Sequence, residues 1–85
     1  MPEITIFTTN SCPYCYAAKA LLKRKGATYR EIDVTGDPAG RLALTERAAG
    51  SRTVPQIWIG PTHVGGSDDL AALDHAGKLD ILLKQ

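Results

Sequence analysis

The sequence lacks the features that mark several large classes of protein. No stretch of its 85 residues approaches the roughly 18 consecutive apolar residues that a membrane-spanning helix needs, so we expect no membrane contact. The net charge is only +1, and the single basic cluster, Lys23–Lys25, falls where a helix is expected to end, so we expect no nucleic-acid partner. The first residues carry no basic segment followed by an apolar one, which predicts a cytoplasmic protein.

Cysteine is also scarce, and its two positions are informative. The chain has two cysteines, Cys12 and Cys15, separated by Pro13 and Tyr14. A disulfide across so short a loop constrains the unfolded chain very little, which makes a purely stabilising role a poor explanation. In a reducing compartment, such a pair is more typical of catalysis or of metal binding.

Internal repeats, low-complexity tracts and linkers are missing as well. The apolar content of 44% and the charged content of 22% are those of an ordinary globular protein. A chain of 85 residues is long enough for one domain with its own core, and too short for two. We therefore expect a single domain over residues 1–85, acting as a monomer.

The pattern of apolar residues and turn residues predicts an α/β fold. Strands are expected at 4–8, 28–34, 56–59 and 62–64, and helices from Pro13 to a stop at Gly26, from Asp37 to Gly50, over 67–76 and over 80–83. The order is β-α-β-α-β-β-α, followed by the short terminal helix. A β-α-β crossover is right-handed and joins parallel strands, whereas the last two strands form an antiparallel hairpin. The prediction is a four-stranded mixed sheet flanked by helices.

The two cysteines are predicted to lie at the start of the first helix. The unpaired N–H groups and the partial positive charge at a helix N-terminus stabilise an anion, and the thiolate is the nucleophilic form of cysteine. Cys12 lies at that end, whereas Cys15 is one turn further along and less exposed. This asymmetry predicts that Cys12 attacks a disulfide and that Cys15 resolves the mixed disulfide.

Three other interpretations of the pair are open from the residues alone. A zinc site needs four ligands, and only His63 and His75 are available to join the cysteines, at a spacing that does not fit the usual pattern. An iron–sulfur cluster requires a second chain and thiols borrowed from elsewhere. The pair is also compatible with two inert, buried cysteines. We expect no bound metal.

Three motifs, in order and in register, carry a family resemblance. They are CPYC at 12–15, TVPQI at 53–57 and GGSDDL at 65–70. With these motifs, the chain resembles a dithiol glutaredoxin of the short bacterial type over essentially its whole length. Thioredoxins share the fold, but they typically carry CGPC at the active site and are longer.

The resemblance implies a thioredoxin-like fold and a reaction. It implies a glutathione-dependent thiol–disulfide oxidoreductase that reduces glutathione mixed disulfides and protein disulfides, with Cys12 and Cys15 as catalytic residues. Glutathione is then the reductant and cosubstrate, and neither a flavin nor a metal is needed. The implied partners are glutathione and glutathionylated or disulfide-containing proteins.

The resemblance also implies a glutathione site and a cis peptide bond before Pro55, which the residues alone leave open. In this site Asp68 or Asp69 takes the glutathione ammonium, although plain helix capping explains the same residues. The implied glutathione-binding residues are Tyr14, Arg41, Thr53, Val54, Pro55, Gly66, Ser67, Asp68 and Asp69.

One position departs from the family pattern. Where relatives commonly carry a lysine three residues before the first cysteine, this chain has Thr9. The glycyl carboxylate of glutathione then needs another cation, for which Arg41 is our first choice and Arg52 our second. Trp58 is expected in the core and His63 in a structural or exposed position.

Two rival functions fit the same motifs. One is a thioredoxin-like protein that a flavoenzyme reduces, and the other is an iron–sulfur cluster carrier or scaffold. Turnover by glutathione distinguishes the first rival, and a visible absorption spectrum after anaerobic purification distinguishes the second.

Overall fold

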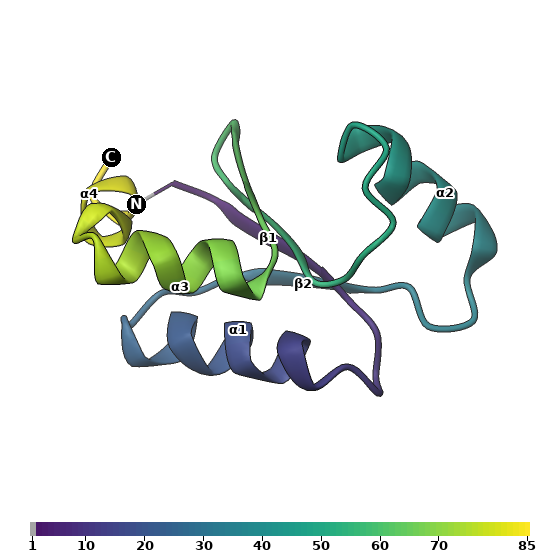
Figure 1. The fold of residues 1–85 in the computed structure, drawn as a ribbon, viewed down its shortest axis with the longest axis horizontal. Helices are drawn as coiled ribbons and strands as arrows, with labels where there is room; N and C mark the ends of the chain where they lie inside the picture. Colours follow the sequence, from purple (N-terminus) through teal and green to yellow (C-terminus); the bar gives the residue numbers. More distant parts are fainter. Residues whose placement is uncertain (1) are drawn as a thin grey trace.

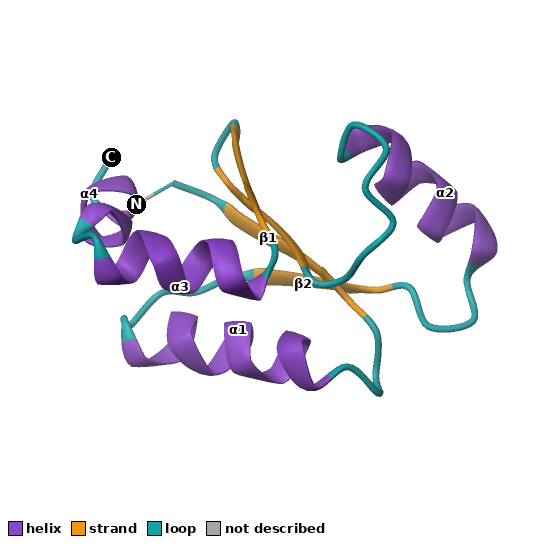
Figure 2. Cartoon of the chain, in the orientation of Figure 1, coloured by secondary structure: helices purple, strands orange, loops and turns teal. Residues whose placement is uncertain are grey.

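A computed structural model describes residues 2–85, which form a four-stranded sheet with helices on both of its faces (Figure 1). The elements follow the predicted order, with the additional helix at the end (Figure 2). They are β1 (Ile4–Thr8), α1 (Pro13–Arg24), β2 (Arg30–Asp33), α2 (Pro38–Arg47), β3 (Gln56–Ile59), β4 (Thr62–Gly65), α3 (Ser67–His75) and α4 (Lys78–Leu83). Within the described residues, none of the helices has the length and apolarity to cross a membrane.

The sheet is mixed, as predicted, with the strand order β2-β1-β3-β4. β1 and β2 are parallel, with Phe7 opposite Ile32. β3 is antiparallel to both of its neighbours, β1 and β4. The crossover through α1 therefore joins two adjacent parallel strands, and the central β1 and β3 are each paired on both sides.

Alternation along the central strands divides the core between the two faces of the sheet. Ile4 and Ile6 of β1, together with Ile57 and Ile59 of β3, pack against α1, α3 and α4. Phe7 and Trp58 point to the other face, where Leu44 and Ala48 of α2 and Val34 complete a smaller cluster. Trp58 is 5% exposed, so its predicted core position is confirmed.

Several boundaries differ from the predicted ones by a few residues. β2 is shorter than the predicted 28–34, because only Arg30–Asp33 pair with β1, opposite Thr5–Thr8. The first and second helices end a little before the predicted glycines, at Arg24 and Arg47. α4 begins at Lys78 rather than at residue 80, because Gly77 adopts a left-handed conformation with φ 72° and reverses the chain directly after α3.

The arrangement of the helices brings two helix N-termini to one end of the molecule. α1 and α3 lie side by side on one face of the sheet and run in the same direction, whereas α2 covers the other face (Figure 1). At the opposite end, Lys25 forms ion pairs with Asp74 (2.6 Å) and Asp80 (3.1 Å). The end of α1 is thereby tied to α3 and α4, far from the helix starts.

The small cluster under α2 can be tested by substitution of its leucine. Leu44 is 1% exposed, whereas Leu42 on the same helix is 61% exposed. Leu44→Ala should lower the free energy of unfolding by about 2–5 kcal/mol, because it leaves a cavity beneath α2. Leu42→Ala, the matched control, should change it by less than about 0.5 kcal/mol. Equilibrium urea unfolding measures both, and equal losses would contradict this assignment of the core.

Candidate active site

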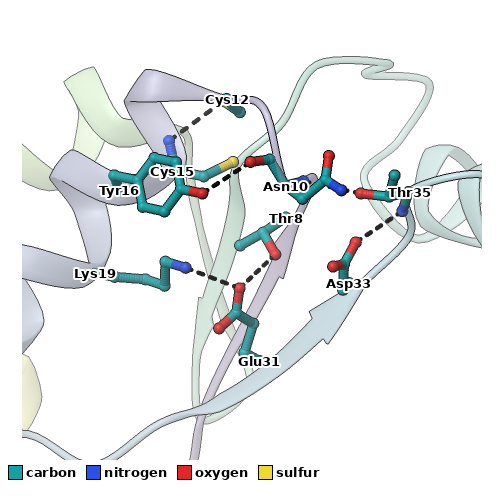
Figure 3. Close-up of polar contacts among 9 residues, drawn as sticks. All are labelled: Thr8, Asn10, Cys12, Cys15, Tyr16, Lys19, Glu31, Asp33 and Thr35. Atoms are coloured by element: carbon teal, nitrogen blue, oxygen red, sulfur yellow. Dashed lines mark hydrogen bonds and ion pairs between the residues drawn. The ribbon is translucent and has the colours of Figure 1, made fainter.

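Cys12 caps the N-terminus of α1 with its own sulfur. It is the N-cap residue, Pro13 is the first residue of the helix, and the Cys12 Sγ accepts a hydrogen bond from the Cys15 backbone N–H at 3.2 Å (Figure 3). The Cys12 thiol in turn donates to the Val54 carbonyl oxygen at 3.6 Å. The sulfur therefore lies between the start of α1 and the loop that precedes β3, where it is half-buried.

Cys15 lies directly behind Cys12 and is fully buried. Burial, together with the hydrogen bond and the charge of Cys12, raises the pKa of the Cys15 thiol to about 12. A raised thiol pKa favours the protonated, unreactive form at neutral pH. Cys12 is thus more accessible than Cys15, as the sequence analysis predicts.

A network of polar side chains supports the turn before the cysteines (Figure 3). The Glu31 carboxylate on β2 accepts hydrogen bonds from the buried Thr8 hydroxyl at 2.7 Å and from Lys19 Nζ at 3.0 Å. These bonds, led by the one from Thr8, hold the pKa of Glu31 below its usual range. The end of β1 and the middle of α1 are in this way fixed to one carboxylate on the neighbouring strand.

The turn itself is held at Asn10. The Tyr16 hydroxyl donates to the Asn10 carbonyl oxygen at 2.8 Å, and the Asn10 N–H donates to the Thr35 hydroxyl at 2.8 Å. These contacts connect the turn to α1 on one side and to the end of β2 on the other (Figure 3). The backbone that leads into Cys12 is therefore fixed from both sides.

A depression of about 560 Å³ opens next to the loop whose Val54 carbonyl contacts the Cys12 sulfur, and Cys12 itself is not among its lining residues. Tyr14 of α1, whose side chain is 63% exposed, borders it on one side, and the loop before β3 borders it on another. Of the predicted glutathione-binding residues, it is lined by Tyr14, Thr53, Val54, Pro55, Gly66, Ser67, Asp68 and Asp69. The Val54–Pro55 peptide bond is cis, as the resemblance implied.

The far end of the depression is the N-terminus of α3. Gly66 is the N-cap residue, and its N–H donates to the Asp69 carboxylate at 2.9 Å. Gly65 has φ 109°, and a Cβ at this position would collide with the Asp69 carboxylate. Asp69 is therefore engaged in capping the helix, and it and the neighbouring Asp68 are both exposed.

Arg41 does not line this depression. It borders a second one, of about 480 Å³, together with Thr9 and Ser11 on the other side of the Cys12 turn. Its Nη2 donates to the Arg52 carbonyl oxygen at 2.9 Å. Thr9, the position at which a lysine was expected, and Arg41, which is predicted to replace that lysine, thus line the same depression.

The predicted glutathione-binding residues leave out five that line the larger depression: Ser51, Gln56, His63, Val64 and Gly65. The sequence analysis places Gln56 in the TVPQI motif and in a strand but gives it no binding role, and it predicts a structural or exposed position for His63. His63 is indeed exposed, but its Nε2 lies 2.7 Å from the Gln56 Oε1. The TVPQI motif was the available signal for Gln56, whereas the strand register that brings His63 to it was not readable from composition.

A half-buried and a fully buried cysteine at the start of the first helix are the arrangement expected of a dithiol redox protein. The Glutaredoxin family model matches residues 4–64 of the chain. The chain is 61% identical over 83 residues to the glutaredoxin of Pseudomonas aeruginosa, covering 98% of each. It is 49% identical over 84 residues to glutaredoxin 3 of Escherichia coli K12, covering 99% of this chain and all of that one.

Solved structures of glutaredoxins are also similar to this chain. The solution structure of glutaredoxin from Brucella melitensis has a TM-score of 0.87 at 55% identity, covering 99% of this chain and 90% of that one. The crystal structure of a buckwheat glutaredoxin–glutathione complex has a TM-score of 0.87 at 32% identity, covering 98% and 77%. The chain therefore belongs to the glutaredoxin family, whose members are thiol–disulfide oxidoreductases with a thioredoxin-like fold.

The contrast between the two thiols is testable by alkylation. Because the pKa of Cys15 is raised to about 12, its thiol stays protonated at neutral pH and should ionise only in strongly alkaline solution. Iodoacetamide should therefore modify the reduced, folded protein once, on Cys12, as measured by peptide mass spectrometry. In guanidinium chloride, the unfolded control should be modified on both cysteines. Modification of Cys15 in the folded protein at a rate near that of Cys12 would contradict the assignment.

Proposed function

We propose that the protein is a glutathione-dependent oxidoreductase that reduces glutathione mixed disulfides and protein disulfides through Cys12 and Cys15. The observation that carries the proposal is the position of the Cys12 sulfur. It lies within hydrogen-bonding distance of the Val54 carbonyl, in the loop that borders a depression ending on a helix N-terminus. Such a depression offers an extended peptide both a backbone edge and an anion site.

The γ-glutamyl end of glutathione fits the α3 end of the depression. Backbone N–H groups at the start of a helix bind a carboxylate. Asp69 already caps α3, so the exposed Asp68 is the better partner for the glutathione ammonium. Gly66 and Ser67 provide close backbone approach at this point.

The cysteinyl and glycyl parts follow from that orientation. The backbone of Val54 pairs with the cysteinyl residue as a short added strand, flanked by Thr53, Pro55 and Tyr14. The glycyl carboxylate is then directed to the second depression, where Arg41 and Thr9 lie together. Arg41 supplies the positive charge that a lysine at position 9 provides in relatives.

The reaction starts with attack of the Cys12 thiolate on the glutathione sulfur of a mixed disulfide. A new sulfur–sulfur bond joins Cys12 to glutathione, and the substrate sulfur leaves as a thiolate that takes up a proton from solvent. The positive end of α1 and the Cys15 N–H stabilise the anionic form of the attacking sulfur.

Two routes regenerate the free thiol. In one, a second glutathione thiolate attacks the glutathione sulfur bound to Cys12, which releases glutathione disulfide and the Cys12 thiolate. In the other, Cys15 attacks the Cys12 sulfur, which releases reduced glutathione and leaves a Cys12–Cys15 disulfide. Two glutathione molecules then reduce that disulfide.

Cytoplasmic location, a monomeric state and the absence of a resident metal stay predictions.

Substitution of each cysteine should separate the two routes. Cys12→Ser should abolish activity on every disulfide substrate. Cys15→Ser should retain removal of glutathione from a glutathionylated peptide, and should lose dithiol reduction of a protein disulfide. A coupled assay of glutathione disulfide formation measures the first, and a thiol assay of the protein substrate measures the second. Loss of peptide deglutathionylation in Cys15→Ser alone would reverse the assigned roles.

The glycyl end is tested at Thr9. Thr9→Lys adds a cation beside Arg41, so it should lower or leave unchanged the KM for a glutathionylated peptide. A peptide carrying γ-glutamylcysteine, which lacks the glycyl carboxylate, is the matched control and should show no gain. A clear rise of KM for the full glutathione substrate would contradict the proposed geometry.

The proposal itself is tested by transfer of glutathione. Reduced protein is incubated with a glutathionylated peptide, and mass spectrometry follows the appearance of glutathione on Cys12. Turnover should follow when glutathione and its reductase are supplied. Reduction by a flavoenzyme specific for thioredoxin, without transfer of glutathione to Cys12, would instead support the thioredoxin-like alternative.

A further inference from the structure

We propose that Gln56 and His63 position the backbone of Thr53 and Val54 for glutathione through a relay of hydrogen bonds that does not touch the reacting sulfur. The inference rests on the proposed glutathione reaction, because it deepens the description of the same depression. Gln56 and His63 both line that depression. Neither is assigned a role by the catalytic steps above.

The loop before β3 is held by side chains rather than by strand pairing. Residues 51–55 form neither helix nor strand. Three successive carbonyl oxygens in this loop nevertheless each accept a hydrogen bond from the side chain of a different element. Arg41 donates to Arg52 O (2.9 Å), Gln56 donates to Thr53 O (3.1 Å), and Cys12 donates to Val54 O (3.6 Å).

Gln56 is the centre of these contacts. Its side chain is 3% exposed, and its amide nitrogen also lies 3.0 Å from the hydroxyl oxygens of Ser51 and Thr53. Burying a carboxamide is unfavourable unless its donors and acceptor are all paired. The pairing found here joins the first residue of β3 to the loop that precedes it.

The donors and acceptors in this chain of contacts have one consistent order. A carbonyl oxygen only accepts, so the Gln56 NH₂ group must face Thr53 O, and the Gln56 Oε1 must face His63. Oε1 also only accepts, so the His63 Nε2, 2.7 Å away, must carry the hydrogen. The relay therefore runs from His63 through Gln56 to the Thr53 carbonyl.

The sheet anchors the start of the relay. His63 is the cross-strand partner of Trp58, and its ring is stacked on the indole with centroids 4.5 Å apart and an interplanar angle of 16°. The Arg47 guanidinium lies over the same indole, with its Cζ 4.4 Å from the ring centroid. The imidazole is in this way placed by β4, which carries it, and by the indole of β3, which Arg47 of α2 also contacts, and not by the loop that it helps to fix.

Because a peptide unit is planar, the contact between Gln56 and the Thr53 carbonyl also fixes the direction of a group that can bind the substrate. The Thr53 carbonyl and the Val54 N–H belong to one planar trans peptide unit, in which the two groups point in opposite directions. When Gln56 fixes the direction of Thr53 C=O, it also directs the Val54 N–H away from Gln56. That N–H is the donor that an added strand of glutathione requires. Gln56 and His63 are therefore positioning residues for the substrate.

Two substitutions of His63 separate the relay from simple packing. His63→Phe keeps a ring on Trp58 but removes the donor to Gln56, whereas His63→Gln keeps a donor near the Nε2 position but removes the ring. We expect His63→Phe to raise the KM for a glutathionylated peptide about three- to tenfold, with kcat within about twofold of the wild type, because one directing hydrogen bond is lost. His63→Gln should have a near-normal KM.

The exposed His75 at the end of α3 offers the matched control, and His75→Phe should change neither constant. A normal KM in His63→Phe, an equal loss in both His63 variants, or a loss only in His63→Gln would each overturn the relay. The last result would show that ring stacking, and not hydrogen bonding, maintains the site.

A measurement independent of activity tests the same relay. Long-range ¹H–¹⁵N spectra of the reduced protein in mildly alkaline buffer should show His63 as the Nε2–H tautomer, and the opposite tautomer would overturn the relay. The Val54 amide resonance should move in His63→Phe and stay in place in His63→Gln. If the wild type fails to turn over glutathionylated peptide, the proposed function fails, and these spectra still decide the relay on their own.

Discussion

The cap on α1 is the interaction on which the rest of the site depends. A helix start needs an acceptor for its free N–H groups, and here that acceptor is the Cys12 sulfur rather than an oxygen. The group that satisfies the helix is therefore also the proposed nucleophile. Because the N–H it accepts belongs to Cys15, one helical turn brings the two sulfurs together and buries the second.

The N-termini of α1 and α3 lie at one end of the molecule, and the ion pairs that join α1 to α3 and α4 lie at the other. Glu31 joins the end of β1 to the middle of α1, and Lys25 joins the end of α1 to α3 and α4. The middle and the C-terminal end of α1 are thus both tied to neighbouring elements, which defines where its N-terminus lies relative to that of α3. The binding proposed above, of a tripeptide with charges at both ends, needs such a defined separation.

Much of the fold was predictable because its signals are local. The alternation in 4–8, the Pro13 helix start and the Gly26 stop each depend on neighbouring residues. They place β1, α1 and the two cysteines correctly, apart from a small shift at the end of α1. Boundaries were less accurate where tertiary contacts decide them. β2 is limited to the four residues that pair with β1, and α4 begins early because of the conformation of Gly77.

Residues of the site that belong to sequence motifs were predictable, whereas residues that only the folded chain brings together were not. Most residues taken from the family motifs line one depression, but Arg41 lies in another with Thr9, since α2 approaches from the opposite face of the sheet. The contact between His63 and Gln56 depends on the pairing of β3 with β4 and on an indole between α2 and the hairpin. No local pattern in the sequence encodes that combination.

The hydrogen bond from the Cys12 thiol to the Val54 carbonyl depends on the protonation state of the sulfur. A thiolate has no hydrogen to donate, so this contact exists only while the Cys12 sulfur carries its proton. The same proton therefore links the state of the sulfur to the surroundings of the Val54 carbonyl, and a change at one atom is a change at the other.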